Sequence, residues 1–360
     1  MSHAANDGVA RHVASRIEDQ FLQFRARRAI DKGLDPVILP YNGYGYASKD
    51  GGWVRVLARV VMAKPGAFEG GKHKAKVVED GIRGFRNFTS AVLPFGKVTV
   101  LAAGQHFEVH ADRGGVLDVK LAVDLPVGWN DIQLIAHNGQ SATAQVLVID
   151  EKQRFGIISD IDDTVVVTAL PRPLLAAWNS FVLSEHARVA TPGMAVMMQR
   201  VLAEHPTSPT IYLSTGAWNV AQTLERFISR NLYPRGPLLL TDWGPTDRAW
   251  FRSGMQHKVD QLRRLAEEFP NIEWMLIGDD GQHDPTIYAE FARRYPEHVR
   301  TIVIRQLTPS EAVLAGGRST DLRRTTPGIR WTYEPDGSQI LEQLSEYKLI
   351  SPEERMPEAN

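Results

Sequence analysis

The chain has no cysteine among its 360 residues. Disulfide bonds, thiolate nucleophiles and thiolate zinc sites are therefore excluded, and a reducing compartment fits this composition. The chain also lacks an excess of either charge, because its formal net charge is −1, so no broad basic field favours a nucleic-acid partner. No run is long and apolar enough for a transmembrane helix, and Met1–Ala10 lacks the apolar core of a signal peptide. We therefore expect a cytoplasmic protein.

The pattern of apolar residues changes near Asp150 and predicts two domains, for which a hydrophobic content of 43% is sufficient. Over residues 36–150, runs with period-two alternation are separated by glycine-containing turns, which predicts an antiparallel β-sandwich. Over residues 151–350, short apolar runs alternate with helical stretches, which predicts a parallel sheet with crossover helices. The strands expected there are 155–160, 210–215, 238–243, 273–280 and 300–307, ahead of a C-terminal tail at 351–360.

Residues 1–35 are expected to form an amphipathic helix ahead of the sandwich. Its apolar side chains share one helical face, flanked by arginines, and comprise Val9, Val13, Ile17, Phe21 and Phe24. Such a stripe either docks on the body of the protein, which is the simpler interpretation, or lies in a membrane interface. The sequence leaves both open.

The most informative stretch sets Asp160 and Asp162 at the end of an apolar strand, with Thr164 two residues further on. Side chains at i and i+2 of an extended chain point the same way, so the two carboxylates converge. Carboxylates that close repel each other unless a cation or a shared proton relieves them. The spacing therefore indicates a metal site, acid–base chemistry, or both.

Further polar residues lie at the predicted carboxyl ends of the other strands, the edge at which open α/β sheets bind ligands. Four elements in chain order, DIDDT (160–164), IYLST (211–215), Lys258 and GDDGQHD (278–284), resemble the motifs of the haloacid dehalogenase superfamily of phosphohydrolases. That resemblance implies an α/β fold, a Rossmann-like, doubly wound parallel sheet of the haloacid dehalogenase type, here preceded by the antiparallel β-sandwich.

The resemblance also implies catalytic roles for three residues. Asp160 resembles the nucleophile that forms an aspartyl-phosphate, and Asp162 the acid that protonates the leaving group and later activates water. Lys258 would be the fixed cation that reduces repulsion between Asp160 and a phosphate dianion. The presence of the second Asp argues against a dehalogenase, and Asp163, whose side chain should point away from the pair, is interpreted as a structural residue.

Binding roles are implied in the same way. The residues expected to bind the substrate are Thr164, Ser214, Thr215 and His257. A Mg²⁺ ion, which prefers oxygen ligands, is expected at Asp160, Asp279 and the carbonyl oxygen of Asp162, with Asp280 or Asp284 completing the acidic shell.

Within that superfamily the closer resemblance is to the App-type, magnesium-dependent phosphatidate phosphatase catalytic domain. It extends over about residues 150–350 and is carried by DIDDTVVVT (160–168), YLSTGAWN (212–219), LYPRGPLLLTDWG (232–244), QHKVDQLRRL (256–265) and LIGDDGQHDPTIY (276–288). The family more often has GDSG where this chain has GDDG, so Asp280 is a departure that adds a charge. The resemblance implies a phosphomonoester hydrolase with phosphatidate as the best substrate.

Two alternatives stay open. One is a phosphatase acting on a phosphoprotein or a soluble small-molecule phosphate. The other is a binding protein that uses the sandwich and carries a vestigial phosphatase fold, against which the complete set of charged residues argues. If the substrate is phosphatidate, the protein acts at a membrane surface without a transmembrane segment, through the N-terminal helix or an apolar flap at 170–183. The oligomeric state is not predicted.

Overall fold

The structure, a computed structural model, describes residues 28, 31–64, 92–167, 189–241, 250–281, 283–315, 317–319 and 326–351. The chain divides into two compact units, Met1–Val148 and Ile149–Asn360, beside the boundary predicted at Asp150. The predicted N-terminal helix, apart from Arg28 and 31–35, and the apolar flap at 170–183 lie outside the described residues.

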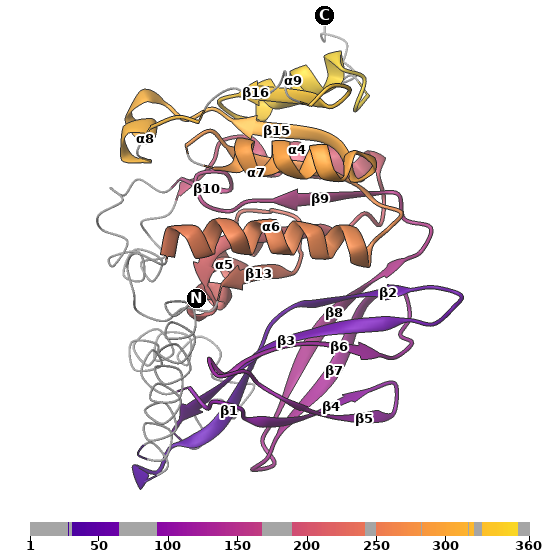
Figure 1. Cartoon of the computed structure of the whole chain (residues 1–360), viewed down its shortest axis with the longest axis vertical. Helices are drawn as coiled ribbons and strands as arrows, with labels where there is room; N and C mark the ends of the chain where they lie inside the picture. Colours follow the sequence, from indigo (N-terminus) through magenta and orange to yellow (C-terminus); the bar gives the residue numbers. More distant parts are fainter. Residues whose placement is uncertain are drawn as a thin grey trace, which may run out of the picture. The chain divides into compact units, whose positions relative to one another are not determined.

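The first unit is one eight-stranded sheet (Figure 1), and the strand order is β1-β3-β2-β8-β7-β4-β5, with β6 on the other edge of β3. The strands are β1 (Asp35–Pro40), β2 (Gly43–Ala47), β3 (Trp53–Ala63), β4 (Lys97–Ala102), β5 (Gln105–His110), β6 (Val116–Ala122), β7 (Gly128–Ala136) and β8 (Ser141–Asp150). The long strand β3 pairs with β1 and β2 in succession and with β6 along 53–59.

The predicted sandwich is wrong. Alternate residues of β3, β4, β6, β7 and β8 enter a single core, but the strands that supply them are hydrogen-bonded into one continuous, nearly closed sheet rather than two facing sheets. Period-two alternation shows only that each strand buries one face. It does not distinguish a sheet that faces a second sheet from one that curls over its own core.

The second unit contains a separate six-stranded sheet of order β13-β12-β9-β14-β15-β16, in which the neighbouring strands are parallel. The strands are β9 (Phe155–Ser159), β12 (Thr210–Ala217), β13 (Leu238–Thr241), β14 (Glu273–Asp279), β15 (Val299–Arg305) and β16 (Arg330–Glu334). The short strands β10 (Val166–Val167) and β11 (Val189–Ala190) form an antiparallel pair outside it.

Helices connect the parallel strands of the second unit. They are α4 (Met194–Glu204), α5 (Ala221–Arg230), α6 (Trp250–Glu268), α7 (Asp284–Arg294), α8 (Pro309–Leu314) and α9 (Gly337–Glu346), with 3₁₀ turns η3 (Trp218–Val220) and η4 (Pro296–His298). Among the described helices none has the length and apolarity needed to cross a membrane.

The fold class expected from the sequence is therefore corrected. Strand residues outnumber helical residues across the described chain, and the architecture is a nearly closed sheet plus a separate parallel sheet. This is not a clear Rossmann-like, haloacid dehalogenase-type fold preceded by a sandwich. What matters for the site is local: β9 lies between β12 and β14, and its five residues are all buried.

Candidate active site

Asp160 follows directly after β9 and is placed by the neighbouring strand. Its backbone N–H donates to the carbonyl oxygen of Ile277 in β14 at 2.8 Å, continuing a register in which Ser159 faces Ile277. Asp279 is the last residue of β14. Because adjacent parallel strands end at the same edge, the two carboxylates lie side by side although they are far apart in the sequence.

Asp284, the first residue of α7, reaches the same edge because residue 278 is glycine. A Cβ atom at Gly278 would lie 2.5 Å from Oδ2 of Asp284 and 2.8 Å from the ring of Tyr288. The Tyr288 hydroxyl donates to the Ile277 carbonyl oxygen at 2.9 Å and is fully buried. The first glycine of GDDG is thus required by the close packing of α7 on β14.

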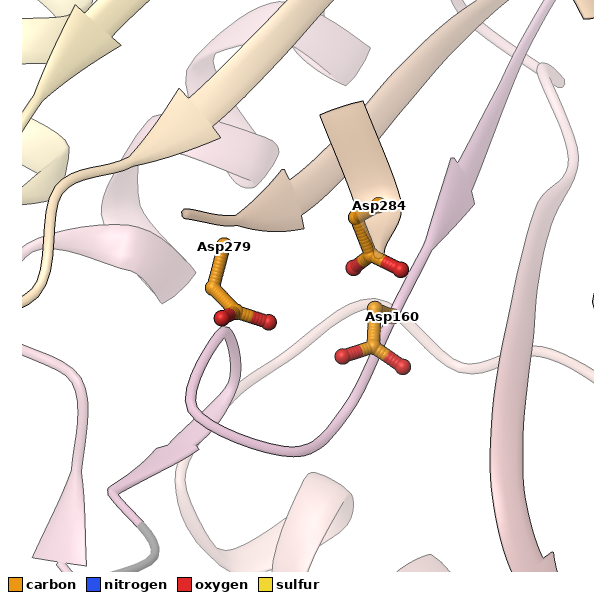
Figure 2. A group of neighbouring side chains, drawn as sticks. All are labelled: Asp160, Asp279 and Asp284. Atoms are coloured by element: carbon orange, nitrogen blue, oxygen red, sulfur yellow. The ribbon is translucent and has the colours of Figure 1, made fainter. Parts of the chain in front are cut away.

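Three carboxylates meet at this edge. One oxygen from each of Asp160, Asp279 and Asp284 lies within 4.8 Å of the others, and all three residues are buried. Figure 2 shows these neighbouring side chains, Asp160 directly after β9, Asp279 in β14 and Asp284 in α7. We call this group the acid cluster.

Lys258 of α6 supplies a buried positive charge to the acid cluster. Its Nζ lies 2.8 Å from Oδ1 of Asp160 and 2.6 Å from Oδ1 of Asp284. Burial by itself lowers the pKa of Lys258, but the two carboxylates outweigh it and raise the pKa above its ordinary value. Lys258 is therefore an ammonium ion, and it fixes Asp160 and Asp284 relative to each other.

One ammonium does not balance three carboxylates. Burial raises the pKa of Asp160 well above its usual range, and neighbouring carboxylates add to that rise while Lys258 opposes it. Burial, followed by the charge of Asp284, raises the pKa of Asp279 in the same direction. Oδ2 of Asp284 is buried without a hydrogen-bond partner among the described residues. Surplus negative charge and an unused oxygen at an all-oxygen site fit a hard divalent cation such as Mg²⁺.

Asp162 stands apart from the acid cluster. Oδ2 of Asp162 accepts a hydrogen bond from Oγ of Ser214 at 3.0 Å, and Ser214 Oγ accepts one from the Gly216 N–H at 2.9 Å. Asp162 is half-buried, whereas Asp160 is 2% exposed. The two residues predicted to share one chemistry thus occupy different environments, one enclosed and one reachable from solvent.

The other predicted substrate-binding residues are placed as follows. Thr164 is fully buried, and its hydroxyl oxygen has no hydrogen-bond partner among the residues described. Thr215 is half-buried, and its carbonyl oxygen accepts from the Thr241 hydroxyl at 3.0 Å. The ring Nε2 of His257 lies 3.5 Å from the carbonyl oxygen of Leu239 in β13. His257 therefore faces β13, and its expected contact with substrate stays a prediction.

Asp280 is not brought into the acid cluster. Its Oδ1 accepts from the Leu307 N–H at 2.9 Å, and its Oδ2 lies 3.5 Å from Nε of Arg318. Successive residues at a strand end point to opposite sides, so Asp279 and Asp280 cannot both face the cluster. Of the two candidates for the last acidic ligand, the structure brings Asp284 to the site.

Arg305, at the end of β15, was not predicted from the sequence to belong to the site. Its side chain is buried, and Nη1 donates to the carbonyl oxygen of Asp163 at 2.7 Å while Nη2 donates to Glu311 at 2.8 Å. Asp163 has a positive φ of 57°, a conformation that costs free energy unless its surroundings hold it. The signal in the sequence is a charged residue that directly follows the apolar run Ile302–Ile304 at the end of the strand VRTIVIR.

Part of the second unit is similar to known proteins. Residues 155–306 match the family model described as "Phosphatidate phosphatase APP1, catalytic domain". Phosphatidate phosphatase APP1 of Saccharomyces cerevisiae is 24% identical over 151 residues, which are 42% of this chain and 25% of that protein. An uncharacterized protein of Schizosaccharomyces pombe is 28% identical over 176 residues, 46% of this chain and 27% of that protein. The chain thus spans about a quarter of the length of these curated relatives.

The match covers every residue assigned above to the acid cluster, together with Asp162, Ser214 and Lys258. Among solved structures, a carbohydrate acetylesterase from Xanthomonas citri is similar at a TM-score of 0.28 and 8% identity, over 82% of this chain and 76% of that one. A likeness this weak carries no argument about fold or function. Residues 155–306, less than half of the chain, are thus similar to the catalytic domain that this family model describes.

Proposed function

We propose that this protein is a Mg²⁺-dependent phosphatase that hydrolyses phosphatidate to diacylglycerol and phosphate through a phosphorylated Asp160. The single observation that supports this most directly is the geometry of Asp160 within the matched segment. Its carboxylate is buried, held by Lys258 at 2.8 Å and flanked by two further carboxylates. A dianionic phosphate is attacked by an anionic nucleophile only where fixed positive charge offsets the repulsion.

The first half of the reaction transfers the phosphoryl group to the protein. A carboxylate oxygen of Asp160 forms a bond to phosphorus as the bond from phosphorus to the ester oxygen breaks. Asp162 gives its proton to the departing alkoxide, and its partly exposed position beside Ser214 allows it to exchange protons with solvent. Lys258 offsets the charge around Asp160 during this step. Mg²⁺ bound by Asp160, Asp279 and Asp284 would supply charge neutralisation at the phosphoryl oxygens.

The second half returns the protein to its starting state. Asp162, now ionised, removes a proton from a water molecule that attacks phosphorus, so the bond between phosphorus and the Asp160 oxygen breaks and inorganic phosphate leaves. The Ser214 hydroxyl, which donates to Asp162 at 3.0 Å in the free protein, would turn to hold a phosphoryl oxygen, and the backbone N–H of Thr215 would hold another. Both proton transfers therefore pass through one carboxyl group.

Phosphatidate is preferred as substrate because the match to the phosphatidate phosphatase catalytic domain extends over 155–306. Other phosphomonoesters, on proteins or small molecules, would satisfy the same chemistry. A binding protein with a vestigial catalytic domain is less favoured, because a buried group of three carboxylates around Lys258 is costly to keep without a function.

The test compares substrates and variants in one assay. Purified full-length protein should release phosphate from phosphatidate in mixed detergent micelles with Mg²⁺, and faster than from glycerol phosphate, a nucleotide or a phosphopeptide. Asp160→Asn should lose this activity because an amide is neither nucleophile nor anion. Asp260→Asn is the matched control, since Asp260 lies on α6 in a 3.1 Å exposed ion pair with Arg263. Activity of Asp160→Asn above the no-enzyme rate would contradict the mechanism, and a preference for a soluble ester would contradict the substrate alone.

A further inference from the structure

The segment from Arg305 to Ser319, of which residues 305–315 and 317–319 are described, runs from the end of β15 through α8, at the same end of the parallel sheet as β10 (Figure 1). All but its first two residues lie beyond the segment that matches the catalytic-domain family, which ends at 306. Nevertheless it contacts the loops that follow β9 and β14, next to Asp160 and Asp279.

Its first contact is with the loop that follows β9. The guanidinium of Arg305, 3% exposed, donates to the Asp163 carbonyl oxygen at 2.7 Å and pairs with Glu311 of α8 at 2.8 Å. Asp163 lies between Asp162 and Thr164 and has the left-handed φ noted above. Arg305 thus links α8 to the residue that directly follows Asp162.

Its second contact is with the loop that follows β14. Asp280 donates its N–H to the Arg305 carbonyl oxygen at 3.0 Å and accepts from the Ser319 N–H at 2.7 Å. Its carboxylate accepts from the Leu307 N–H at 2.9 Å and faces Arg318 at 3.5 Å. Both the backbone and the side chain of Asp280 therefore bind the segment, at the residue next to Asp279.

Packing completes this attachment. Leu307, Ala312 and Ala315 form a small buried cluster, and a Cβ at Gly281 would lie 2.6 Å from Cδ1 of Leu307 and 2.9 Å from Cβ of Ala315. The Gly281 N–H donates to Oδ1 of Asp279 at 2.6 Å. The segment thus packs against Gly281, whose N–H orients the carboxylate of Asp279.

We infer that residues 305–319 form a brace that sets the positions of Asp160 and Asp279, and that Arg305 and Asp280 are positioning residues through which it acts. Asp280 in this role supports the metal site without being a ligand. Partners that orient the ligands of a metal site change its affinity by about tenfold or more when they are removed. The inference rests on the proposed function in that it assumes Mg²⁺ binding at the acid cluster.

The experiment measures Mg²⁺ binding to the full-length protein by titration calorimetry without substrate. Asp280→Asn and Arg318→Gln should each weaken Mg²⁺ binding by about tenfold. The double variant should bind Mg²⁺ about as weakly as Arg318→Gln alone, because both changes break the contact between Asp280 and Arg318, and Arg318→Gln also removes a hydrogen bond to the Leu307 carbonyl oxygen. Arg305→Lys, which cannot hold Asp163 and Glu311 together, should weaken binding to a similar extent. Arg293→Gln is the matched control, since it removes an exposed 2.6 Å ion pair with Glu290 on α7.

Two results would overturn the inference. If Asp280→Asn abolished Mg²⁺ binding while Arg318→Gln left it unchanged, Asp280 would be a ligand; if all variants bound like wild type, the brace would have no influence on the site. Hydrogen–deuterium exchange of residues 160–166 gives a readout without metal, and it should speed up in Arg305→Lys but not in Arg293→Gln. Unchanged exchange would refute the Arg305 contact even if the wild type bound no Mg²⁺. Loss of phosphatidate as substrate would leave these measurements unaffected.

Discussion

Replacing Lys258 by methionine removes the charge that holds the acid cluster together and leaves a side chain of similar length. Lys258 Nζ contacts Asp160 and Asp284 at 2.8 and 2.6 Å, and each charged hydrogen bond contributes about 1.5–3 kcal/mol. Removing one partner of a buried charge group costs about 3–5 kcal/mol, because the remaining charges stay buried without compensation. In EDTA at pH 7.5, the free energy of unfolding of Lys258→Met should therefore fall by about this amount.

The pH dependence of this loss has a definite sign. The carboxyl pKa values of Asp160 and Asp279 are raised in the folded state and should rise further without Lys258. A group whose pKa is raised on folding binds protons in the folded state, so its destabilising effect is full above the folded pKa and disappears as the pH falls toward the unfolded value near ~3.9. The difference between variant and wild type should thus be smaller at pH 5 than at pH 7.5.

Urea unfolding followed by tryptophan fluorescence measures this difference, with Trp274 fully buried in β14 as a probe inside the second unit. Adding Asp279→Asn to Lys258→Met should recover part of the lost stability, since one uncompensated charge is removed. Equal unfolding curves for wild type and Lys258→Met at pH 7.5, or a difference that grows at pH 5, would refute this account of the acid cluster.

Two further predictions concern the proton donor and the packing of α7. Asp162→Asn should lose most activity on an alkyl phosphate but much less on a phosphate with a strongly acidic leaving group, which departs without a proton; equal losses on both, measured as kcat, would exclude Asp162 as the general acid. Gly278→Ala should lower stability by about 1–3 kcal/mol and reduce activity, because its Cβ would lie 2.5 Å from Asp284 Oδ2. A thermal melt and a rate assay measure both effects. Ala292→Gly, also on α7, is the comparison variant, whereas Gly33→Ala is unsuitable because Gly33 has a positive φ. A stable and fully active Gly278→Ala would show that α7 can shift.

The sequence placed Asp160 and Asp279 at the ends of apolar strands because that placement depends on local spacing, whereas Asp162, expected to converge with Asp160, pairs with Ser214 instead. Asp160 and Asp279 end neighbouring apolar strands, and parallel pairing alone brings them together. It did not predict the curled sheet of the first unit, because alternation in β3 says which face is buried and nothing about what covers that face.

The choice between Asp280 and Asp284 shows a second limit. Both residues are acidic and lie close to Asp279 in the sequence, so spacing alone leaves both possible. Asp284 reaches the acid cluster because α7 packs on Gly278. Asp280 is kept away from it by a hydrogen bond from the Leu307 N–H and by its contact with Arg318. Arg305 could not be assigned for the same reason, since its partners Asp163 and Glu311 are set by tertiary structure.

The hydrogen bond from the Asp160 N–H to Ile277 makes the distance between the two strand ends independent of the chain that joins them. More than a hundred residues separate Asp160 from Ile277 in the sequence, yet the distance between them is set by one backbone hydrogen bond between neighbouring strands. Connecting segments can therefore lengthen, shorten or change composition during evolution without moving Asp160 relative to Asp279. In such a domain the sheet sets the positions of the acidic residues, while the connecting segments can vary and with them the choice of substrate.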